Sequence, residues 1–573
     1  MLKKMKLKKI CILILSVFVF MSTFTSIANA SISDFSASLM APLRITDFAA
    51  FQYELEMAKD MGAESISVDV WWGDVEKYAD NQFDWSYYDE VFAMIRNANL
   101  EIIAIMSFHQ AGGNVGDTYH SYLPSWVWGK YTGNYFDGMT IAANDLKYVS
   151  ELGNVSNEFL SLWVDELIQY EYIDFMNAFE NQFGTYANYF SEINISAGPS
   201  GELRFPSYNS HDAGNMYSGY PNKGYLQSYS NIAIKDFRGD MLLKYGGLAG
   251  VNVAWGLAMG SEYDIRPPND GGDFFYHYSK PYLNTQYGRD FIAWYNNELV
   301  LHGDRMLQYV NIAFDGQFRN IVRGMKMPGI HWQIANSEFP RTAEITAGLI
   351  NTDFSANNSY GYKNILNMIK AHNNTVLHFT CLEMSDYNSE PTSRPKTLVR
   401  WLGESAKSVG VVIKGENALN GGNDSSTFWH NINHAIDNHF YRGITILRMN
   451  DAVFGESNRY FRDLVNKNIT LEDKNSSRIT FRLHEGNTIP GENIYVIGSH
   501  PNIGNWDTSK AVRLFTYNYP SWTVTIEGIS KSTELEFKFI KKKNGSVIWE
   551  DSIPNRGLIV SENYIILDSN WNR

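Results

Sequence analysis

The sequence contains almost no cysteine and only one apolar run long enough to suggest insertion into a membrane. Of its two cysteines, Cys11 lies inside that N-terminal run and Cys381 in the interior of the chain. A chain without its N-terminal segment can form no internal disulfide, so its stability must come from core packing or a bound metal. Cys381 could be a catalytic nucleophile, but no motif containing histidine lies near it, which argues against that role.

The first thirty residues have the features of a secretory signal peptide. Five lysines between Lys3 and Lys9 precede the apolar run Ile10–Phe20, and Ala28-Asn29-Ala30 is a small-x-small cleavage site. We expect cleavage near Ala30 and export of a protein without a membrane anchor. Loss of these five lysines, with no acidic residue lost, changes the net charge from −14 to −19. Such an acidic protein would repel the phosphates of nucleic acids.

Short apolar segments alternate with amphipathic helical stretches over residues 31–465. The predicted strands are Ala37–Leu43, Ser65–Val70, Ile102–Phe108, Ile193–Ala197, Gly329–Ile334, Val376–Thr380, Val411–Ile413 and Ile444–Arg448. Continuous apolar strands are typical of parallel sheets covered on both faces, and the helix Phe48–Met61 ends clearly at Gly62. These eight strand–helix units predict an α/β fold, a (β/α)8 TIM barrel with long active-site loops. A ninth run, Val251–Leu257, is assigned to an insertion because nine strands would not close this barrel.

The pattern changes after the barrel. Residues 466–477 are polar and aperiodic, which predicts a linker. Residues 478–573 alternate polar and apolar positions in short runs separated by Gly, Asn and Pro, which predicts a small antiparallel β-sandwich. Its expected strands are Ile479–Leu483, Ile494–Gly498, Thr523–Ile526, Leu535–Ile540, Val547–Trp549 and Tyr564–Leu567.

Four segments place acidic or polar side chains directly after predicted strands, where barrel enzymes build their active sites. They contain Asp69, the glycine-rich loop His109–Asp117, Glu202 in Gly198–Tyr208, and Glu416 in Gly415–Leu419. Inverting hydrolysis of a glycosidic bond needs one protonated carboxyl group for the leaving oxygen and one carboxylate to activate water. Taken singly, each acid is explained as well by a solvated cap or a surface ion pair.

Together these segments resemble the beta-amylase family, the 1,4-α-glucan maltohydrolases. The sequences HQAGGNVGD (109–117) and GPSGELRFPSY (198–208) are similar to that family's two signature segments. Phe379–Met384 and Gly415–Leu419 resemble its inner loop and its base-bearing strand end. The resemblance covers the whole predicted barrel. It implies an exo-acting inverting hydrolase that releases β-maltose from the non-reducing ends of starch and related 1,4-α-glucans.

The resemblance also implies roles for single residues. Glu202 matches the general acid, Glu416 the general base, Asp117 the acid that positions the sugar, and Thr380 the hydroxyl that holds the deprotonated acid. The other glucan-binding positions are Asp69, His109, Lys326, His331, Asn417, Leu419 and Arg448. Lys326 would keep Glu416 ionised, whereas a drier pocket would keep Glu202 protonated. We expect the two carboxyl groups to lie ~6.5–9.5 Å apart or further.

A calcium site is a further implication. Glu76, Asp80 and Asn81, together with Glu171 and Asp174, resemble the calcium site of bacterial family members. Oxygen ligands from two segments suit the flexible coordination of calcium. Solvated acids on a loop and a helix explain the same residues equally well. No organic cofactor is expected.

The C-terminal sandwich resembles a starch-binding domain of carbohydrate-binding family twenty. Trp506 and Trp549 would offer flat faces to glucose rings, while Lys538, Glu550 and Asn555 would bond the hydroxyl groups. The expected partners are starch, amylopectin and maltodextrins, bound by a monomer with no nucleic-acid or membrane partner. Two alternatives stay open: a non-catalytic starch-binding or sensing protein on the same scaffold, and a retaining endo-amylase that would release α-anomeric products.

Overall fold

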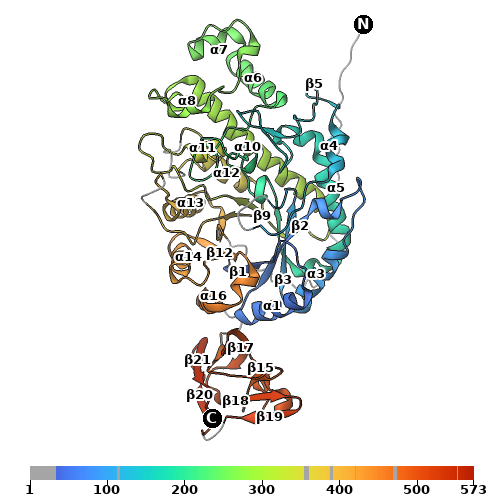
Figure 1. Cartoon of the computed structure of the whole chain (residues 1–573), viewed down its shortest axis with the longest axis vertical. Helices are drawn as coiled ribbons and strands as arrows, with labels where there is room; N and C mark the ends of the chain where they lie inside the picture. The colour runs from blue at the N-terminus through green and yellow to red at the C-terminus, as the bar shows by residue number, and fades with distance from the viewer. Residues whose placement is uncertain are drawn as a thin grey trace, which may run out of the picture.

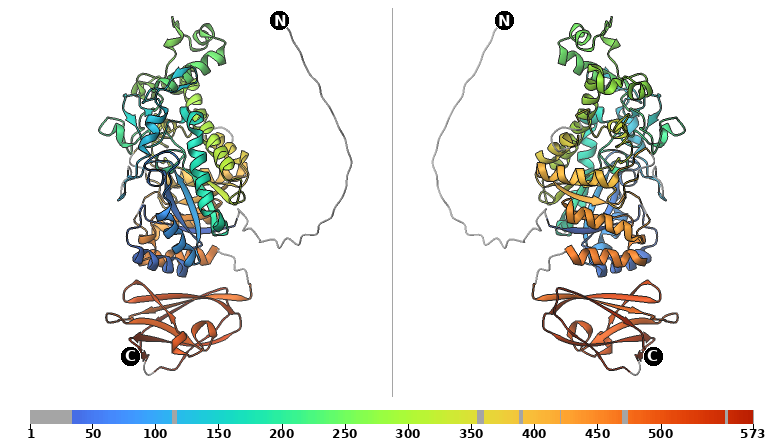
Figure 2. Two further views of the ribbon diagram at one scale, coloured as in Figure 1. Left: turned by 90° about the vertical axis from the view of Figure 1, so that its right-hand side faces the viewer. Right: turned by 90° about the vertical axis from the view of Figure 1, so that its left-hand side faces the viewer.

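The computed structural model describes residues 34–112, 117–353, 360–387, 391–419, 421–468, 474–550 and 553–572. The expected signal peptide lies outside these residues. A small all-β domain lies at one end of the long axis, a barrel in the middle and a group of helices at the other end (Figures 1 and 2). Among the described helices, none combines the length and the apolar character that a membrane crossing requires.

Eight parallel strands close into a barrel in the order β1-β12-β11-β10-β9-β8-β3-β2. Their bounds are β1 Ser36–Met40, β2 Ser65–Trp71, β3 Glu101–Ser107, β8 Phe190–Ile195, β9 Val322–Met327, β10 Thr375–Phe379, β11 Val412–Glu416 and β12 Tyr441–Ile446. Each strand pairs with its predecessor and successor among the eight, and β12 pairs with β1. The predicted (β/α)8 barrel is confirmed.

The position of the fifth strand was predicted wrongly. The sequence indicated Gly329–Ile334, but the strand is β9 (Val322–Met327), and the chain beyond it is irregular. The error has a physical cause, because β9 carries two charged residues and therefore shows no continuous apolar run. Arg323 is buried and donates to the Phe318 carbonyl at 2.9 Å, while Lys326 lies in the functional site described below. The other seven predicted strands match within three residues at each end.

Helices follow the barrel strands and cover them from outside. They are α1 Phe48–Met61, α3 Ser86–Asn97, α5 Asp165–Phe183, α10 Gln286–Ala313, α12 Lys363–Ala371, α13 Pro395–Val409, α14 Ser426–Asn438 and α16 Gly455–Asn468. In α1, Asp47 accepts a cap bond from the Ala50 amide at 2.9 Å, and Gly62 ends the helix with φ 91°, as predicted.

Long insertions after the strands hold the remaining elements of this domain. They contain α2 Trp72–Val75, α4 Ser125–Tyr131, α6 Asn231–Tyr245, α7 Leu248–Trp255, α8 Gly271–Tyr276, α9 Pro281–Asn284, α11 Thr342–Thr346 and α15 Met449–Ala452. Two short hairpins, β4–β5 (Tyr135–Phe136, Met139–Thr140) and β6–β7 (Tyr148–Val149, Val155–Ser156), lie between α4 and α5. The ninth apolar run is helix α7, which lies outside the barrel as expected.

The C-terminal domain consists of two packed sheets. One has the order β16-β17-β13-β21, and the other β15-β14-β18-β19 with β20 on β18. The bounds are β13 Ser476–His484, β14 Asn493–Gly498, β15 Val512–Arg513, β16 Phe515–Asn518, β17 Ser521–Ser530, β18 Glu534–Lys543, β19 Ser546–Trp549, β20 Arg556–Ile559 and β21 Tyr564–Asn570. The sandwich is mostly antiparallel as predicted, but β13 and β21 pair in parallel.

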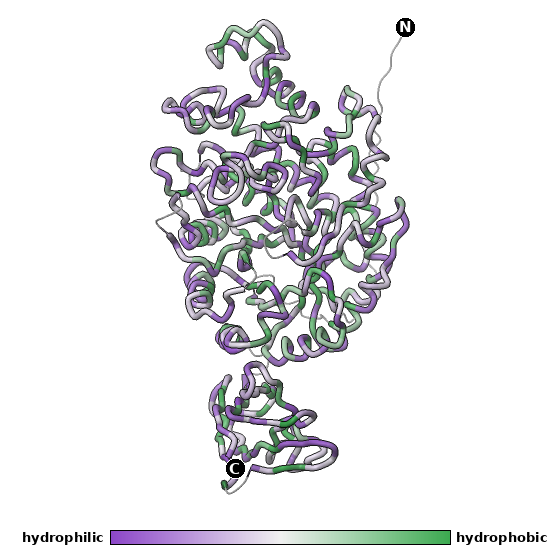
Figure 3. Tube along the Cα trace, in the orientation of Figure 1, coloured by the Kyte–Doolittle hydropathy of each residue, from purple (hydrophilic) through white to green (hydrophobic). Residues whose placement is uncertain are grey.

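Each domain has its own hydrophobic core, and hydrophobic residues are spread through both (Figure 3). In the barrel domain Phe92 of α3 and Phe183 of α5 meet edge to face with their ring centroids 4.9 Å apart. In the sandwich Phe481 and Phe537 make the same kind of contact at 4.9 Å. Such aromatic pairs add to the free energy gained by burying their area.

The sandwich is fastened to the amino-terminal end of the barrel. Asp60, at the end of α1, accepts from the Arg462 guanidinium of α16 at 2.7 Å and from the Thr525 amide of β17 at 2.6 Å. The Tyr53 ring of α1 meets the Phe515 ring of β16 with centroids 6.0 Å apart. Arg462 is fully buried in this contact. The predicted linker is shorter than expected, because α16 continues to Asn468 and β13 begins at Ser476; residues 469–473 lie outside the described chain.

Candidate active site

Glu202 lies in an extended segment between β8 and β9. The Leu203 amide donates to the Lys326 carbonyl at 2.8 Å, which holds this segment alongside the end of β9. Gly201 precedes Glu202 with φ 76°, and a Cβ atom there would lie 3.1 Å from the His109 ring. Glycine at this position therefore allows both the turn and the close approach of His109.

The surroundings of Glu202 favour its protonated form. Burial raises the pKa of Glu202 above its usual value, and Glu416 acts in the same direction. The Arg204 guanidinium, 3.0 Å away, and the more distant Lys326 oppose this rise without cancelling it. About 14% of the Glu202 side chain stays exposed, so a substrate oxygen can reach it. A carboxyl group of this kind is suited to donate a proton.

Glu416 ends strand β11 and has a different neighbour. The Lys326 ammonium lies 2.9 Å from one carboxylate oxygen and 3.1 Å from the other, and both residues are buried. Gly415 allows this packing, because a Cβ atom there would lie 2.0 Å from Leu382. The lysine balances the charge of this buried carboxylate, and a carboxylate at this place can accept a proton from water, as a general base does.

A second polar layer lies beneath Glu416 in the barrel interior. His378 Nδ1 is 3.6 Å from a Glu416 oxygen, and its Nε2 is 2.5 Å from Glu192. Lys414 pairs with the other Glu192 oxygen at 2.8 Å. Burial alone would raise the pKa of Glu192, but Lys414 and His378 lower it below the usual value. Sequence reasoning missed this layer, whose only signal is a charged or polar residue inside each of three apolar strands.

The expected glucan-binding residues gather at the carboxyl ends of the strands. Asp69 accepts from the Ser107 hydroxyl at 2.9 Å and lies 3.9 Å from Arg448. The rings of His109 and His331 bond Ser196 and Ser393 at 2.8 and 2.7 Å. Burial lowers the pKa of both histidines to about 4, so both rings are neutral at neutral pH.

The remaining predicted residues lie on the loops around this edge. Asn417 donates to the Leu419 carbonyl at 2.7 Å, and the Leu419 side chain is 56% exposed. Thr380 accepts from the Gly329 amide at 2.8 Å on the loop after β10. Asp117 accepts from the Gly112 amide at 3.2 Å, although residues 113–116 of its loop lie outside the described chain.

Arg204 belongs to the site but was not singled out from the sequence. It is 1% exposed and donates to Glu202 at 3.0 Å and to Asn209 at 2.7 Å. Arg204 follows Glu202 by two residues, and residues two apart on an extended chain project to the same side. The sequence could therefore have indicated that Arg204 lies beside Glu202. Cys381, by contrast, is fully buried, and burial raises the pKa of its thiol well above the usual value. A thiol in this environment is a poor nucleophile.

The residues expected to bind calcium already have other partners. Glu76 accepts from the Trp72 indole at 2.7 Å and from the Asn81 amide at 2.5 Å. Asp80 and Glu171 both accept from the Lys130 ammonium at 2.6 Å, and Asp174 is exposed. Because calcium needs six to eight oxygen ligands around one point, this arrangement does not fit the ion while Lys130 holds that point.

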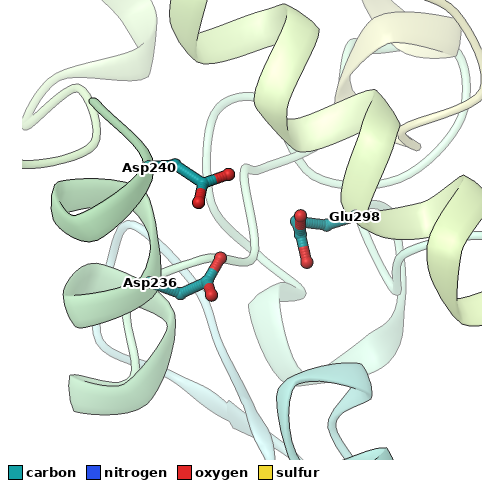
Figure 4. A group of neighbouring side chains, drawn as sticks. All are labelled: Asp236, Asp240 and Glu298. Atoms are coloured by element: carbon teal, nitrogen blue, oxygen red, sulfur yellow. The ribbon is translucent and has the colours of Figure 1, made fainter. Parts of the chain in front are cut away.

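A different acidic cluster lies in the insertion between β8 and β9. Among the described residues, one group of three acids has carboxylate oxygens within 4.8 Å of one another: Asp236, Asp240 and Glu298. Their side chains point toward one another from α6 and α10 (Figure 4). Burial raises the pKa of Asp236 to about 6 and that of Glu298 to about 8. Burial and the mutual repulsion of the acids thus both favour the protonated forms of Asp236 and Glu298.

Two tryptophans form the predicted sugar-binding face of the sandwich. The Trp506 and Trp549 ring centroids are 6.4 Å apart with 32° between the ring planes, and Trp549 is 37% exposed. Asn555 is exposed and donates to Glu536 at 3.0 Å, and Lys538 is half-buried in β18, which pairs with the strand of Trp549. Glu550 differs from expectation, because its buried carboxylate already accepts from Arg556 and from the Phe539 amide, each at 2.8 Å. Glu550 therefore stabilises the sandwich through these hydrogen bonds, and its carboxylate is not free to bind a sugar.

Comparison with known proteins decides the family. The family described as Glycosyl hydrolase family 14 matches residues 38–475. The chain belongs to glycosyl hydrolase family 14. A second family, described as Starch binding domain, matches residues 476–565, which is the sandwich up to the start of its last strand, β21.

Relatives within family 14 align along nearly the whole chain. A thermophilic beta-amylase of Thermoanaerobacterium thermosulfurigenes is 37% identical over 91% of both proteins, and a beta-amylase of Bacillus cereus is 34% identical over 94% of both. The solved catalytic domain of a Paenibacillus polymyxa beta-amylase is 34% identical, with a TM-score of 0.67 over 76% of this chain and 99% of that one. The predicted family, fold and enzyme class are confirmed; the roles of single residues stay predictions.

Proposed function

We propose that this family 14 enzyme is a beta-amylase that releases β-maltose from the non-reducing ends of starch by inversion, with Glu202 as general acid and Glu416 as general base. The observation that carries the proposal is the contrast between these two carboxyl groups. One has a raised pKa beside Arg204, and the other is buried against a lysine. Enzymes that need an acid and a base at one pH obtain them by such differences in environment.

The proposed reaction is a single displacement. Glu202 gives its proton to the glycosidic oxygen of the leaving glucan, while Glu416 takes a proton from a water molecule. The water oxygen bonds to the anomeric carbon on the face opposite the departing oxygen, so the product has the β configuration. Lys326 stabilises Glu416 while it is ionised, and Thr380 holds Glu202 after it has lost its proton. A carboxyl separation of ~6.5–9.5 Å or more stays part of this proposal.

The other predicted residues are assigned to substrate and surface binding. Five residues that line the strand ends would bond glucose hydroxyls: Asp69, His109, Asp117, His331 and Arg448. The sandwich would hold starch through Trp506 and Trp549. The composition of residues 1–30 supports export of the enzyme, and we propose that it acts as a monomer outside the cell.

Anomeric analysis of the first product tests the proposed reaction. We expect proton NMR during hydrolysis of maltopentaose to show the β-anomer of maltose before mutarotation, and starch viscosity to fall slowly. Early α-maltose with a rapid loss of viscosity would identify a retaining endo-amylase. Binding of starch without any product would identify a non-catalytic protein.

Replacing both tryptophans of the sandwich tests the proposed starch-binding face. We expect Trp506→Ala/Trp549→Ala to bind granular starch about 10- to 100-fold more weakly, because truncating an aromatic contact residue typically costs ~2 kcal/mol. Hydrolysis of soluble maltopentaose should stay unchanged. Ile559→Ala is a matched control, since it removes an exposed apolar side chain from β20 of the same sheet. Equal loss of granule binding in the control would contradict the assignment.

A further inference from the structure

Lys130 lies between two acids of the group that resembles the calcium site of bacterial relatives. Its ammonium is 2.6 Å from an Asp80 oxygen and 2.6 Å from a Glu171 oxygen. Asp80 belongs to the loop after α2, Glu171 to α5 and Lys130 to α4. A single positive charge therefore joins three separate elements at this place.

The surrounding contacts hold the ammonium in position. The Tyr131 hydroxyl donates to the same Glu171 oxygen that Lys130 contacts. The Trp126 ring lies 5.5 Å from the ammonium, and its indole donates to the Glu76 carbonyl at 2.8 Å. Glu171 is 3% exposed, so its charge needs a partner inside the protein.

The ammonium and a calcium ion would compete for the same oxygens. Calcium binds carboxylate oxygens at about 2.3–2.6 Å, which is the distance at which Asp80 and Glu171 already contact the nitrogen. A calcium ion between these carboxylates would have to displace the lysine, since two cations cannot share that point. To bind the ion, Glu76 would also have to lose its hydrogen bonds, because its two carboxylate oxygens already accept from the Trp72 indole and the Asn81 amide.

We infer that the Lys130 ammonium takes the place of a structural calcium ion in this enzyme, so that the junction of the loop 76–81, α4 and α5 carries its own cation. The fold then gains the charge neutralisation of a metal site without needing the metal. The inference concerns stability and ion binding, and it does not depend on the proposed reaction.

The full-length enzyme provides the first test. We expect its Tm to be the same, within about 1 °C, after exhaustive dialysis against EDTA and in 5 mM CaCl2. We expect Lys130→Ala to unfold several degrees lower in EDTA and to recover most of that loss in CaCl2. Lys130→Arg keeps the cation and should behave as the parent. Lys147→Ala is the matched control, because Lys147 contacts the neighbouring Trp128 ring without joining the acidic group.

Direct ion binding gives the second test. Calorimetric titration with CaCl2 should show one more bound ion per chain in Lys130→Ala than in the parent or in Lys147→Ala, and Asp80→Asn in that background should remove it. Two results would overturn the inference. One is a parent enzyme whose Tm drops in EDTA and whose calcium binding is lost in Asp80→Asn. The other is Lys130→Ala protein that gains no calcium binding.

Discussion

Glu202→Gln is expected to lower kcat on soluble starch by ~10²–10⁴-fold, the range that a general acid contributes. Glutamine keeps the shape of the side chain and its contact with Arg204 but has no proton to give to the leaving oxygen. The Glu416→Gln enzyme should lose activity to a similar extent, because it cannot accept a proton from water. In both, KM should change little. Initial rates of maltose release, measured with a coupled assay, check the expectation.

Glu64→Gln separates the chemistry from a general effect of the substitution. Glu64 is a half-buried glutamate just before β2, at the opposite end of the barrel, and burial raises its pKa to about 7. We expect this variant to keep full activity and all three proteins to bind granular starch equally well. Activity within 10-fold of the parent in Glu202→Gln or Glu416→Gln would remove that residue from the proposed mechanism.

Lys326→Met is expected to lower kcat by about 10²-fold or more near the acidic end of the activity range. Breaking a buried ion pair leaves the remaining carboxylate without a partner, and a positioned general base typically contributes ~10²–10⁴-fold to the rate. Without the ammonium 2.9 Å away, Glu416 loses the interaction that favours its ionised form. The acidic limb of the kcat profile should therefore move to higher pH. Rates measured from pH 4 to pH 9 would show the shift.

Lys244→Met provides the matched control for the Lys326 substitution. Lys244 also pairs with a buried carboxylate, that of Asp290 at 2.8 Å, but the pair lies between the insertion helix α6 and α10. We expect a small loss of Tm and an unchanged pH profile. A Lys326→Met enzyme with lower activity but the same profile would mean that the lysine only supports the local structure.

The sequence predicted those features that depend on the chemistry of single segments. Apolar periodicity was enough for seven barrel strands, and the segment around Glu202 was enough to indicate its position at a strand end. Apolar periodicity did not predict β9, since Arg323 and Lys326 interrupt the apolar pattern of that strand. A charged residue inside a strand can be explained only when its partner elsewhere in the fold is known.

Pairing across the barrel also explains what else was missed. His378, Glu192 and Lys414 come from β10, β8 and β11, and only closure of the barrel brings them beneath Glu416. Lys130 is the same kind of case, because its two carboxylate partners are 50 and 41 residues away in the chain. The residues of the expected calcium site could be found by resemblance, whereas the lysine between them could not.

The contact between the two domains at Asp60 and Arg462 limits how the sandwich can assist catalysis. It places the sandwich below the barrel, next to α1 and α16 (Figure 1). Glu416 lies at the carboxyl end of β11, and Glu202 pairs with Lys326 near the end of β9. Trp549 belongs to β19, in the sheet opposite the one whose strand β17 bonds to Asp60. We therefore expect a short glucan at the proposed tryptophan face not to reach the active site. On the proposed function, the sandwich would act as a tether that raises the effective concentration of neighbouring chain ends around the active site. Its benefit should grow with the density of chain ends on an insoluble surface and vanish for short dissolved oligosaccharides.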